Sequence, residues 1–350
     1  MLVPQSYFPL VRPRPADEVL PGTPMPVSIR RMFYLPGVAS AWNGCWLARV
    51  VSNWVAGMGK LDPKATVLDA HFGYPEGVGC YRVARRQNLP LFITVRGLET
   101  ELMSVPSIKR QMLEAFDYCT GIIAVSQSLK DMLVENGVDA TKIRVISNGV
   151  DSDTYSPREK EASRSVLGVS LDAQIIVGLG NIQRRKGYDL LIEAIATYRD
   201  NQRFLCVILG GVNEPTTMAR LEARTSELGL KERVRFLGQA TPDVVVNWFR
   251  AADMFVLPTR REGCCNAVLE ALSTGVPVIS TPAGDNTKFV VDGSNGFIVP
   301  HEDPDAIGQS IEKSWNHPWD AQSISRSVRP YTWDGTAEQV IEFFKERLGC

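Results

Sequence analysis

The sequence predicts an α/β protein made of two doubly wound, Rossmann-like domains that face each other across a cleft. At roughly 150 residues per domain, 350 residues suggest two domains. From residue 65 onward short apolar strands alternate with helices, as in parallel sheets covered on both faces. The polar stretch NGVDSDTYSP at residues 148–157 interrupts this alternation. We therefore expect an N-terminal domain over 1–150, a C-terminal domain over 151–335 and a closing helix over 336–350.

The elements of each domain follow from these apolar runs. The first 60 residues hold many prolines, so we expect mostly loop there. In the rest of the first domain the predicted strands are 65–72, 91–97, 121–126 and 142–147, and the predicted helices are 76–87, 107–118 and 127–137. In the second domain the predicted strands are 173–180, 204–210, 233–238, 253–258 and 277–281, and the predicted helices are 188–198, 214–228, 242–251 and 266–273.

Composition excludes several classes of protein. Hydrophobic residues at 44% and charged residues at 22% are typical of a folded globular chain. The net charge of -1 gives no overall attraction for nucleic acid. Seven scattered cysteines without a CxxC pair indicate reduced thiols and no zinc site. There is no apolar run of the ~20 residues that a membrane helix needs, and prolines stand where a signal peptide would be apolar, so we expect a cytoplasmic protein.

The segment 261–278, REGCCNAVLEALSTGVPV, carries the clearest chemical signal. Glu262 stands in a loop after a strand, and Glu270 lies about one turn into the next helix. Free amides at the helix start, near Asn266, favour a diphosphate, and the two carboxylates can accept hydroxyl groups from a sugar and a ribose. The pattern suits a sugar nucleotide. The alternative is that the two residues are an ordinary helix-start acid and a solvated helix residue.

This segment resembles the donor-site signature, E-x7-E, of retaining GT-B glycosyltransferases of family four. The resemblance implies that Glu262 binds the donor sugar and acts in catalysis, and that Glu270 binds the ribose. It also implies that the donor contacts the residues between them, which are Gly263, Cys264, Cys265 and Asn266. Similarity to the family extends roughly from residue 67 to residue 348.

The segment 178–187, GLGNIQRRKG, is a second candidate for the donor site. As a dinucleotide fingerprint it lacks the third glycine, and as a P-loop it lacks the Gly-Lys-Ser/Thr ending. It resembles the family's G-R-x-x-x-x-K-G loop, which implies that Gly180, Asn181 and Lys186 bind the donor, with Lys186 at the diphosphate. Asn181 stands where the family commonly has arginine, so Arg184 or Arg185 is expected to supply the second charge. The alternative is that both arginines belong to a solvated loop.

The segment 65–102 resembles a branch of the family that acts in exopolysaccharide, capsule and teichuronic-acid-like synthesis. Many members have histidine where this chain has Arg96, which could steady the departing diphosphate or orient the sugar. Glu99 could contact the acceptor or fix Arg96. His71, at another strand end, is either structural or a binding or catalytic residue. We interpret the Asp151-x-Asp153 pair as turn chemistry rather than as a metal site.

Family members usually begin with a β-α-β unit that precedes a segment like VPQSYFP, and here Met1 opens directly into that segment. The hypothesis is a truncated reading of a longer enzyme, with an incomplete N-terminal domain. The alternative is a reorganised domain in which residues 25–34 supply a replacement strand.

The expected function is transfer of a sugar from a nucleotide-diphosphate sugar, such as a UDP-sugar, to a hydroxyl of a glycan or lipid-linked glycan precursor, with retention. No metal and no other cofactor is expected, because Lys186, a nearby arginine and helix amides would neutralise the diphosphate. A lipid-linked acceptor would bring the protein to the inner face of a membrane, and no nucleic-acid partner is expected. The alternatives are a noncatalytic or truncated relative that binds nucleotide sugar, and a GT-B nucleotide-sugar epimerase. Neither the donor base nor the acceptor follows from the sequence.

Overall fold

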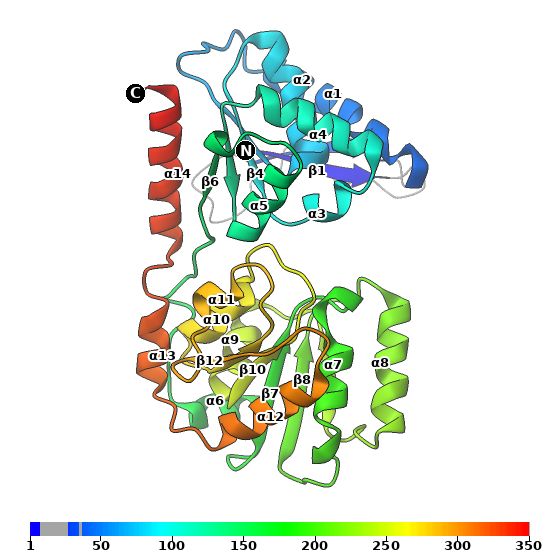
Figure 1. Cartoon of the computed structure of the whole chain (residues 1–350), viewed down its shortest axis with the longest axis vertical. Helices are drawn as coiled ribbons and strands as arrows, with labels where there is room; N and C mark the ends of the chain where they lie inside the picture. The colour runs from blue at the N-terminus through cyan, green and yellow to red at the C-terminus, as the bar shows by residue number, and fades with distance from the viewer. Residues whose placement is uncertain (8–26, 35–36, 350) are drawn as a thin grey trace. The chain divides into compact units, whose positions relative to one another are not determined.

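A computed structural model of the chain describes residues 1–7, 27–34 and 37–349. Its contacts divide it into two compact units (Figure 1): unit 1 comprises Met1–Ile146 and Val340–Cys350, and unit 2 comprises Ser147–Gln339. This division falls just before the boundary expected at residue 150. Helix α14 (Trp333–Leu348) begins in unit 2 and ends in unit 1.

Unit 1 contains a parallel sheet with the strand order β3-β4-β5-β6. The strands are β3 (Leu68–His71), β4 (Leu91–Val95), β5 (Gly121–Ala124) and β6 (Ile143–Val145). The helices and the π-type turn between and beside them are η2 (Gly73–Gly77), α2 (Val78–Gln87), α3 (Glu99–Leu102), α4 (Pro106–Tyr118) and α5 (Gln127–Glu135). Every residue of β4 and β5 is buried, which explains their continuous apolar sequence. On this sheet Phe92 stacks with Phe344 of α14, with ring centroids 3.9 Å apart.

The expectation of mostly loop before residue 60 is wrong for the described residues. Strands β1 (Leu2–Tyr7) and β2 (Ser28–Phe33) pair in parallel, and η1 (Gly37–Trp42) leads into helix α1 (Asn43–Ala56). Helix α1 is amphipathic, and its buried residues Leu47, Val51 and Val55 recur at helical spacing. The many prolines that precede it led to the prediction of loop. Helix α1 packs closely on α2, since a Cβ at Gly79 would lie 2.8 Å from Cγ of Leu47. Most of the prolines lie in 8–26, outside the described residues.

The expected replacement strand at residues 25–34 does not join the main sheet. Strand β2 pairs with β1 in a separate two-stranded sheet, while β3 pairs with β4 alone among the described strands. The alternative is thus confirmed in that residues 28–33 form a strand, and wrong in that this strand does not replace one of the main sheet, because it finds its partner within the N-terminal segment.

Unit 2 contains a six-stranded parallel sheet with the order β12-β11-β10-β7-β8-β9. The strands are β7 (Gln174–Leu179), β8 (Phe204–Leu209), β9 (Val234–Gly238), β10 (Met254–Leu257), β11 (Val278–Ser280) and β12 (Gly296–Ile298). The helices and 3-10 turns are α6 (Lys160–Leu167), η4 (Arg184–Lys186), α7 (Tyr188–Ala194), η5 (Ala196–Tyr198), α8 (Pro215–Glu227), α9 (Pro242–Ala251), α10 (Asn266–Ser273), α11 (Asn286–Phe289), α12 (Pro304–Trp315) and α13 (Ala321–Ser327). The alternation predicted from the sequence is confirmed, and β12 adds a strand that the sequence reading missed.

The strand order of unit 2 defines where a ligand site belongs. From β7 the chain continues through β8 and β9 to one side, and then returns to β10, β11 and β12 on the other side. The order therefore reverses between β7 and β10. In doubly wound sheets a crevice opens at this point, outside the carboxyl ends of the strands.

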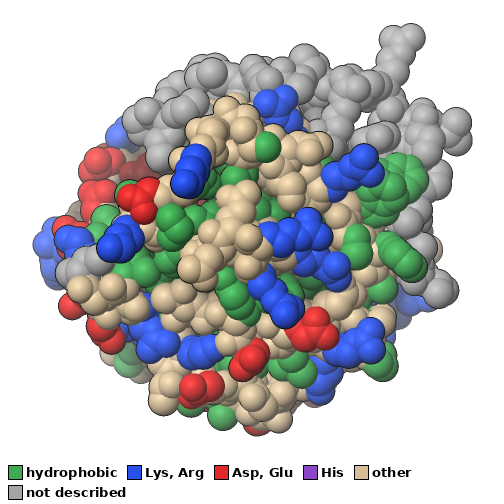
Figure 2. All heavy atoms as spheres, turned by 90° about the horizontal axis from the view of Figure 1, so that it is seen from above, with side chains coloured by type: hydrophobic (Ala, Val, Ile, Leu, Met, Phe, Trp, Pro, Cys, Tyr) green, Lys and Arg blue, Asp and Glu red, His purple; other side chains and the backbone are tan. Residues whose placement is uncertain are grey.

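The surface of unit 1 seen in Figure 2 carries Lys and Arg side chains next to hydrophobic ones. Trp42 at the end of η1 and Trp46 and Arg49 on α1 have exposed side chains. Of the helices in the described residues, none combines the length and the apolar character that crossing a bilayer requires.

Candidate donor site in unit 2

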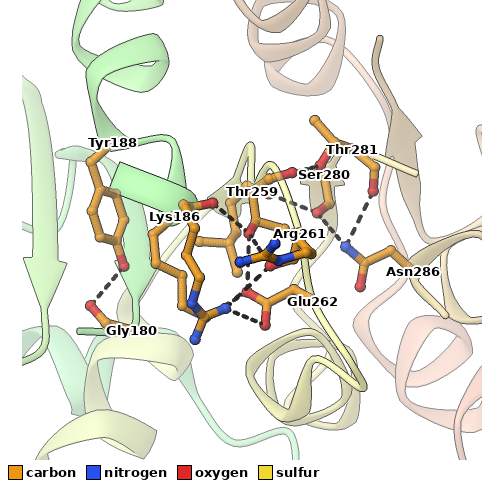
Figure 3. Close-up of polar contacts among 11 residues, drawn as sticks. Gly180, Lys186, Tyr188, Thr259, Arg261, Glu262, Ser280, Thr281 and Asn286 are labelled. Carbon is orange, nitrogen blue, oxygen red and sulfur yellow. Dashed lines mark hydrogen bonds and ion pairs between the residues drawn. The ribbon is translucent and has the colours of Figure 1, made fainter. Parts of the chain in front are cut away.

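Two loops meet where the strand order of unit 2 reverses. One follows β7 and includes Arg185, and the other follows β10 and includes Thr259 and Arg260. The amide of Arg260 donates to the carbonyl oxygen of Arg185 (2.8 Å), and the hydroxyl of Thr259 donates to the same oxygen (2.9 Å). These bonds hold the two loops side by side and bring their functional side chains together (Figure 3).

A buried carboxylate with two cations forms the centre of this site. Nζ of Lys186 lies 2.6 Å from Oε1 of Glu262 (Figure 3). Nη1 of Arg185 lies 3.0 Å from Oε2 of the same carboxylate. The hydroxyl of Thr259 lies 3.1 Å from Oε1. The side chains of Lys186 and Glu262 are 10% and 7% exposed. Two cations against one carboxylate leave a net positive charge, which suits a diphosphate.

The sequence left open which arginine supplies the second charge, and the structure places Arg185 at Glu262. Arg184 is exposed, and its backbone makes its contacts here: its amide donates to Oε2 of Glu214 (2.9 Å), and its carbonyl accepts from Arg260 (2.7 Å). The structure thus places Arg185 rather than Arg184 beside Glu262, and contact of either arginine with a donor stays a prediction.

Gly180 lies where a side chain would not fit. Its φ of +145° is unfavourable for L residues, and a Cβ there would lie 2.9 Å from Cε of Lys186. The hydroxyl of Tyr188 donates to its carbonyl (2.9 Å; Figure 3). Asn181 accepts from the amide of Gly211 (3.2 Å), so its side chain ties this loop to the one after β8. Contact of Gly180 and Asn181 with a donor stays a prediction.

Helix α10 begins next to this cluster. No side chain caps its first turn, so the amides there are available to an anion. Asn266, its first residue, accepts from Nδ2 of Asn148 (2.8 Å). Burial raises the pKa of the Cys264 thiol to about 11 and that of Cys265 to about 12, so both stay neutral at pH 7. Gly263 is buried, and its carbonyl oxygen would lie 2.3 Å from a Cβ added at Gly284.

Glu270 lies one turn into α10. Burial raises the pKa of its carboxyl to about 7, so near neutral pH it is partly protonated and can donate as well as accept. Burial also raises the pKa of Tyr155 to about 12, and Glu270 adds to this shift, which places the two side chains near each other.

Further hydrogen bonds stiffen the loop after β10. The hydroxyl of Thr281, which follows β11, donates to the carbonyl of Thr259, and Nδ2 of Asn286 donates to the carbonyl of Thr281 (3.2 Å; Figure 3). Arg260 binds Asp189 at 2.8 Å and Glu302 at 2.9 Å. The sequence did not predict these hydrogen bonds, because most of the residues that form them are far apart in the chain and come together only in the folded sheet.

The residues predicted in unit 1 also come together. Nδ1 of His71 accepts from Nη2 of Arg96 (2.8 Å), and Nε2 of His71 lies 3.3 Å from Asp69. Glu99 is fully buried and accepts from the amides of Gly73 (2.7 Å), Arg96 (3.1 Å) and Gly97 (2.9 Å). The carboxylate of Glu99 thus fixes the backbone at Arg96, as one of the two expected roles requires, and its contact with an acceptor stays a prediction.

The Asp151-x-Asp153 pair forms a turn, as predicted. The carboxylate of Asp151 accepts from the hydroxyl of Thr154 (2.6 Å) and from the amide of Asp153 (3.1 Å). Within residues 1–7, 27–34 and 37–349, no three His, Cys, Asp or Glu side chains lie where they could hold a metal ion.

Two sequence families match the chain. Glycosyltransferase Family 4 matches residues 9–154, and Glycosyl transferases group 1 matches residues 159–329. The D-inositol 3-phosphate glycosyltransferase of Corynebacterium urealyticum is 32% identical over 61% of this chain and 53% of its own length. The enzyme of that name from Corynebacterium efficiens is 31% identical over 64% of this chain and 56% of its own length. The chain thus spans about half the length of these curated relatives.

Solved structures of similar fold cover most of the chain. Sucrose-phosphate synthase from Thermosynechococcus elongatus has a TM-score of 0.79 at 19% identity and covers 91% of this chain and 83% of its own. Anabaena Alr3699/HepE in complex with UDP-glucose has a TM-score of 0.78 at 19% identity and covers 92% and 86%. These neighbours confirm the predicted fold, two Rossmann-like α/β domains of the GT-B kind.

Proposed function

We propose that the chain is a retaining glycosyltransferase, because Glycosyltransferase Family 4 matches residues 9–154 and Glycosyl transferases group 1 matches residues 159–329. It moves a sugar from a nucleotide-diphosphate sugar to a hydroxyl of a glycan or lipid-linked glycan precursor. The observation that carries the proposal is the buried pair of Lys186 and Glu262, with Arg185 beside it, at the strand-order reversal of unit 2 and next to the uncapped start of α10.

The donor is held by charge and by backbone amides. Lys186, Arg185 and the first amides of α10 neutralise the diphosphate, so no metal is needed for that purpose. When Lys186 and Arg185 bind the phosphates instead of Glu262, the carboxylate of Glu262 accepts hydrogen bonds from hydroxyl groups of the sugar. Glu270 binds the ribose. The Anabaena protein of similar fold was solved with UDP-glucose, and on this support we propose a UDP-sugar as the donor.

In the proposed reaction the bond between the anomeric carbon and the phosphate oxygen breaks, and its electron pair goes to the phosphate. The acceptor oxygen bonds to the anomeric carbon on the same face, and its proton goes to the departing phosphate oxygen. Retention follows from same-face attack without a covalent sugar–enzyme bond. In unit 1, Arg96 and His71 are the proposed partners of the reacting groups, and Glu99 is a positioning residue.

The test combines binding and turnover. Purified protein is mixed with a panel of UDP- and GDP-sugars, and thermal stability and nucleoside diphosphate release are measured. A donor at 100 times its dissociation constant should stabilise the fold by about 2.7 kcal/mol. Lys186→Met and Glu262→Gln should lose this gain, while Glu222→Gln, an exposed control on α8, should keep it. Arg96→Gln should bind the donor but release less nucleoside diphosphate than the wild type.

Other outcomes favour the rival functions. Donor binding without release of diphosphate, with any acceptor offered, favours a noncatalytic binding protein. A changed sugar on an intact nucleotide, or release of nucleoside diphosphate with an altered free sugar, favours an epimerase. No stabilisation by any donor in a folded sample rejects the proposal.

We also propose peripheral association with a membrane surface when the acceptor is lipid-linked. Trp42, the last residue of η1, is 64% exposed, and the exposed Trp46 and Arg49 follow it on α1, a combination that suits the interface of an anionic bilayer. Flotation with vesicles that contain anionic phospholipid tests this. Trp42→Ser combined with Trp46→Ser should reduce flotation, and equal flotation of this variant and the wild type would reject the surface as the contact.

A further inference from the structure

A cavity of 460 Å³ lies in unit 2 away from the donor loops. Its wall includes Asp253 and Pro277, which immediately precede β10 and β11. The donor loop residues Pro258 and Thr281 immediately follow the same two strands. Because the strands are parallel, the cavity and the donor site lie at opposite edges of the sheet. The cavity is therefore a separate feature.

The wall of this cavity holds a buried arginine without a charged partner among its hydrogen bonds. Arg250, only 8% exposed, donates from Nε to the carbonyl of Ser156 (2.9 Å) and from Nη2 to the carbonyl of Thr154 (2.7 Å). These neutral oxygens leave the guanidinium charge uncompensated. Burial lowers the pKa of Arg250, and the charge of Arg158, also in the wall, lowers it further. An anion between the two guanidinium groups would relieve both effects.

The acidic residue of the wall is already occupied. Asp253 accepts from Lys160 (2.8 Å) and Arg164 (3.0 Å), and also from the amide of Ile175 (2.8 Å). It therefore does not neutralise the pair of arginines. With Arg158, Lys160 and Arg250 against Asp253, the residues that line the cavity carry a net positive charge.

A further polar atom at this cavity lacks a partner. Nδ1 of His317 is buried and makes no hydrogen bond to any described residue, although buried polar atoms usually have one. The imidazole stacks on Trp319, with ring centroids 3.9 Å apart, and both residues line the cavity. The wall thus offers two guanidinium groups, an unsatisfied imidazole nitrogen and an aromatic surface.

We propose that this cavity binds a small phosphate monoester. Guanidinium groups match the oxygens of a phosphate, and the imidazole can donate to a further oxygen. A volume of 460 Å³ falls within the range of small-molecule sites. Helix α10 begins at the donor loop, and the turn that follows it, Thr274–Pro277, forms part of the cavity wall. The ligand would thus contact the end of the helix whose start faces the donor.

Calorimetric titration of the full chain with inorganic phosphate and with glycerol 3-phosphate tests the proposal. Lys186→Met is used as the background, so that phosphate binding at the donor cluster does not contribute. We expect one monoester per chain. Arg158→Glu should weaken binding at least about tenfold, and Arg158→Lys should keep it within about threefold. His317→Phe should weaken it too, since it removes the nitrogen but keeps an aromatic ring.

Arg220→Glu on α8 is the matched control, because it makes the same change of net charge at an exposed position outside the cavity. Its affinity should equal that of the background. The proposal is overturned when Arg158→Glu and Arg220→Glu weaken binding equally, since that would indicate a general charge effect. It is also overturned when the Lys186→Met protein binds neither inorganic phosphate nor glycerol 3-phosphate. That result would leave the cluster of Lys186, Arg185 and Glu262 as the one anion site.

Discussion

The ammonium group of Lys186 lies 2.6 Å from Oε1 of Glu262, and both side chains are almost fully buried. The family resemblance assigns Lys186 to the diphosphate and Glu262 to the sugar. In the absence of a ligand, these two side chains form an ion pair with each other. A bound diphosphate would compete with Glu262 for Lys186. This competition would free the carboxylate for the sugar hydroxyls only when the phosphates are in place.

Removal of one partner of this pair should destabilise unit 2. Glu262→Gln leaves Lys186 and Arg185 without their carboxylate, and we expect a loss of about 3 kcal/mol in the free energy of unfolding. Lys186→Met should cost less, since Arg185 still pairs with Glu262. The double variant should lose less than the sum of the single losses, because the pair is broken only once. Urea denaturation of the four proteins measures this cycle.

The pH dependence of stability should report Glu270. Its pKa is raised by burial from 4.5 to about 7 in the folded protein. Between these pH values the folded state keeps a proton that the unfolded chain has lost, so the free energy of unfolding falls as pH rises and levels off above about 7. Glu270→Gln should therefore be more stable than wild type at pH 8, by about 1–3 kcal/mol, and nearly equal at pH 4.

The measurement is urea denaturation at pH 4, 6 and 8. Glu76 contributes in the same direction, because burial raises its pKa to about 7 as well, so Glu270→Gln should remove only part of the wild-type decline. Glu222→Gln, exposed on α8, should follow the wild type. A parallel offset of Glu270→Gln at all three pH values would contradict the assignment.

The strands and helices of unit 2 were largely predictable because their apolar runs are continuous and well separated. Helices α9 (Pro242–Ala251) and α10 (Asn266–Ser273) have the bounds that the sequence predicts. Helix α1 was missed, since its amphipathic pattern follows a proline-rich segment. Strand β12 was missed because three residues, Gly296–Ile298, carry too short a pattern.

In the candidate site, only the residues that belong to the two signature segments were predictable from the sequence. Lys186 and Glu262 follow from the two signature segments, and the structure brings them together. The choice between Arg184 and Arg185 depends on the direction of each side chain in a turn, which spacing does not determine. The burial of Glu99 depends on three amides from two loops, so its role follows from the fold alone.

Glu99 should be essential for the order of the loops after β3 and β4. Its carboxylate accepts from Gly73, which follows β3, and from Arg96 and Gly97, which follow β4. Glu99→Gln replaces one of the two accepting oxygens by an NH2 group, which is a donor and would face an amide donor. We expect a loss of about 2–4 kcal/mol in the free energy of unfolding, measured by urea denaturation. Glu114→Gln, exposed on α4, should cost less than about 0.5 kcal/mol. Equal losses for the two variants would show that the amide contacts contribute nothing.

Two glycines of unit 2 with similar backbone angles should respond differently to alanine. Gly187 has φ +72°, and a Cβ there would lie 1.9 Å from the carbonyl oxygen of Pro258, which is backbone and cannot rotate away. Gly168 has φ +64°, and a Cβ there would meet nothing within 4 Å. Gly168→Ala should therefore cost only the conformational strain, about 1 kcal/mol. Gly187→Ala should cost that strain and also separate the loops after β7 and β10.

We expect Gly187→Ala to lower the free energy of unfolding by more than about 3 kcal/mol and to weaken donor binding, because the separated loops no longer hold Lys186 against Glu262. Urea denaturation and donor-induced thermal shift, applied to both variants, make the comparison. Gly168→Ala should bind the donor like the wild type, since it lies at the end of α6. Equal stability losses in the two variants would mean that the Gly187–Pro258 approach relaxes freely, and the loop contact would then not position the site.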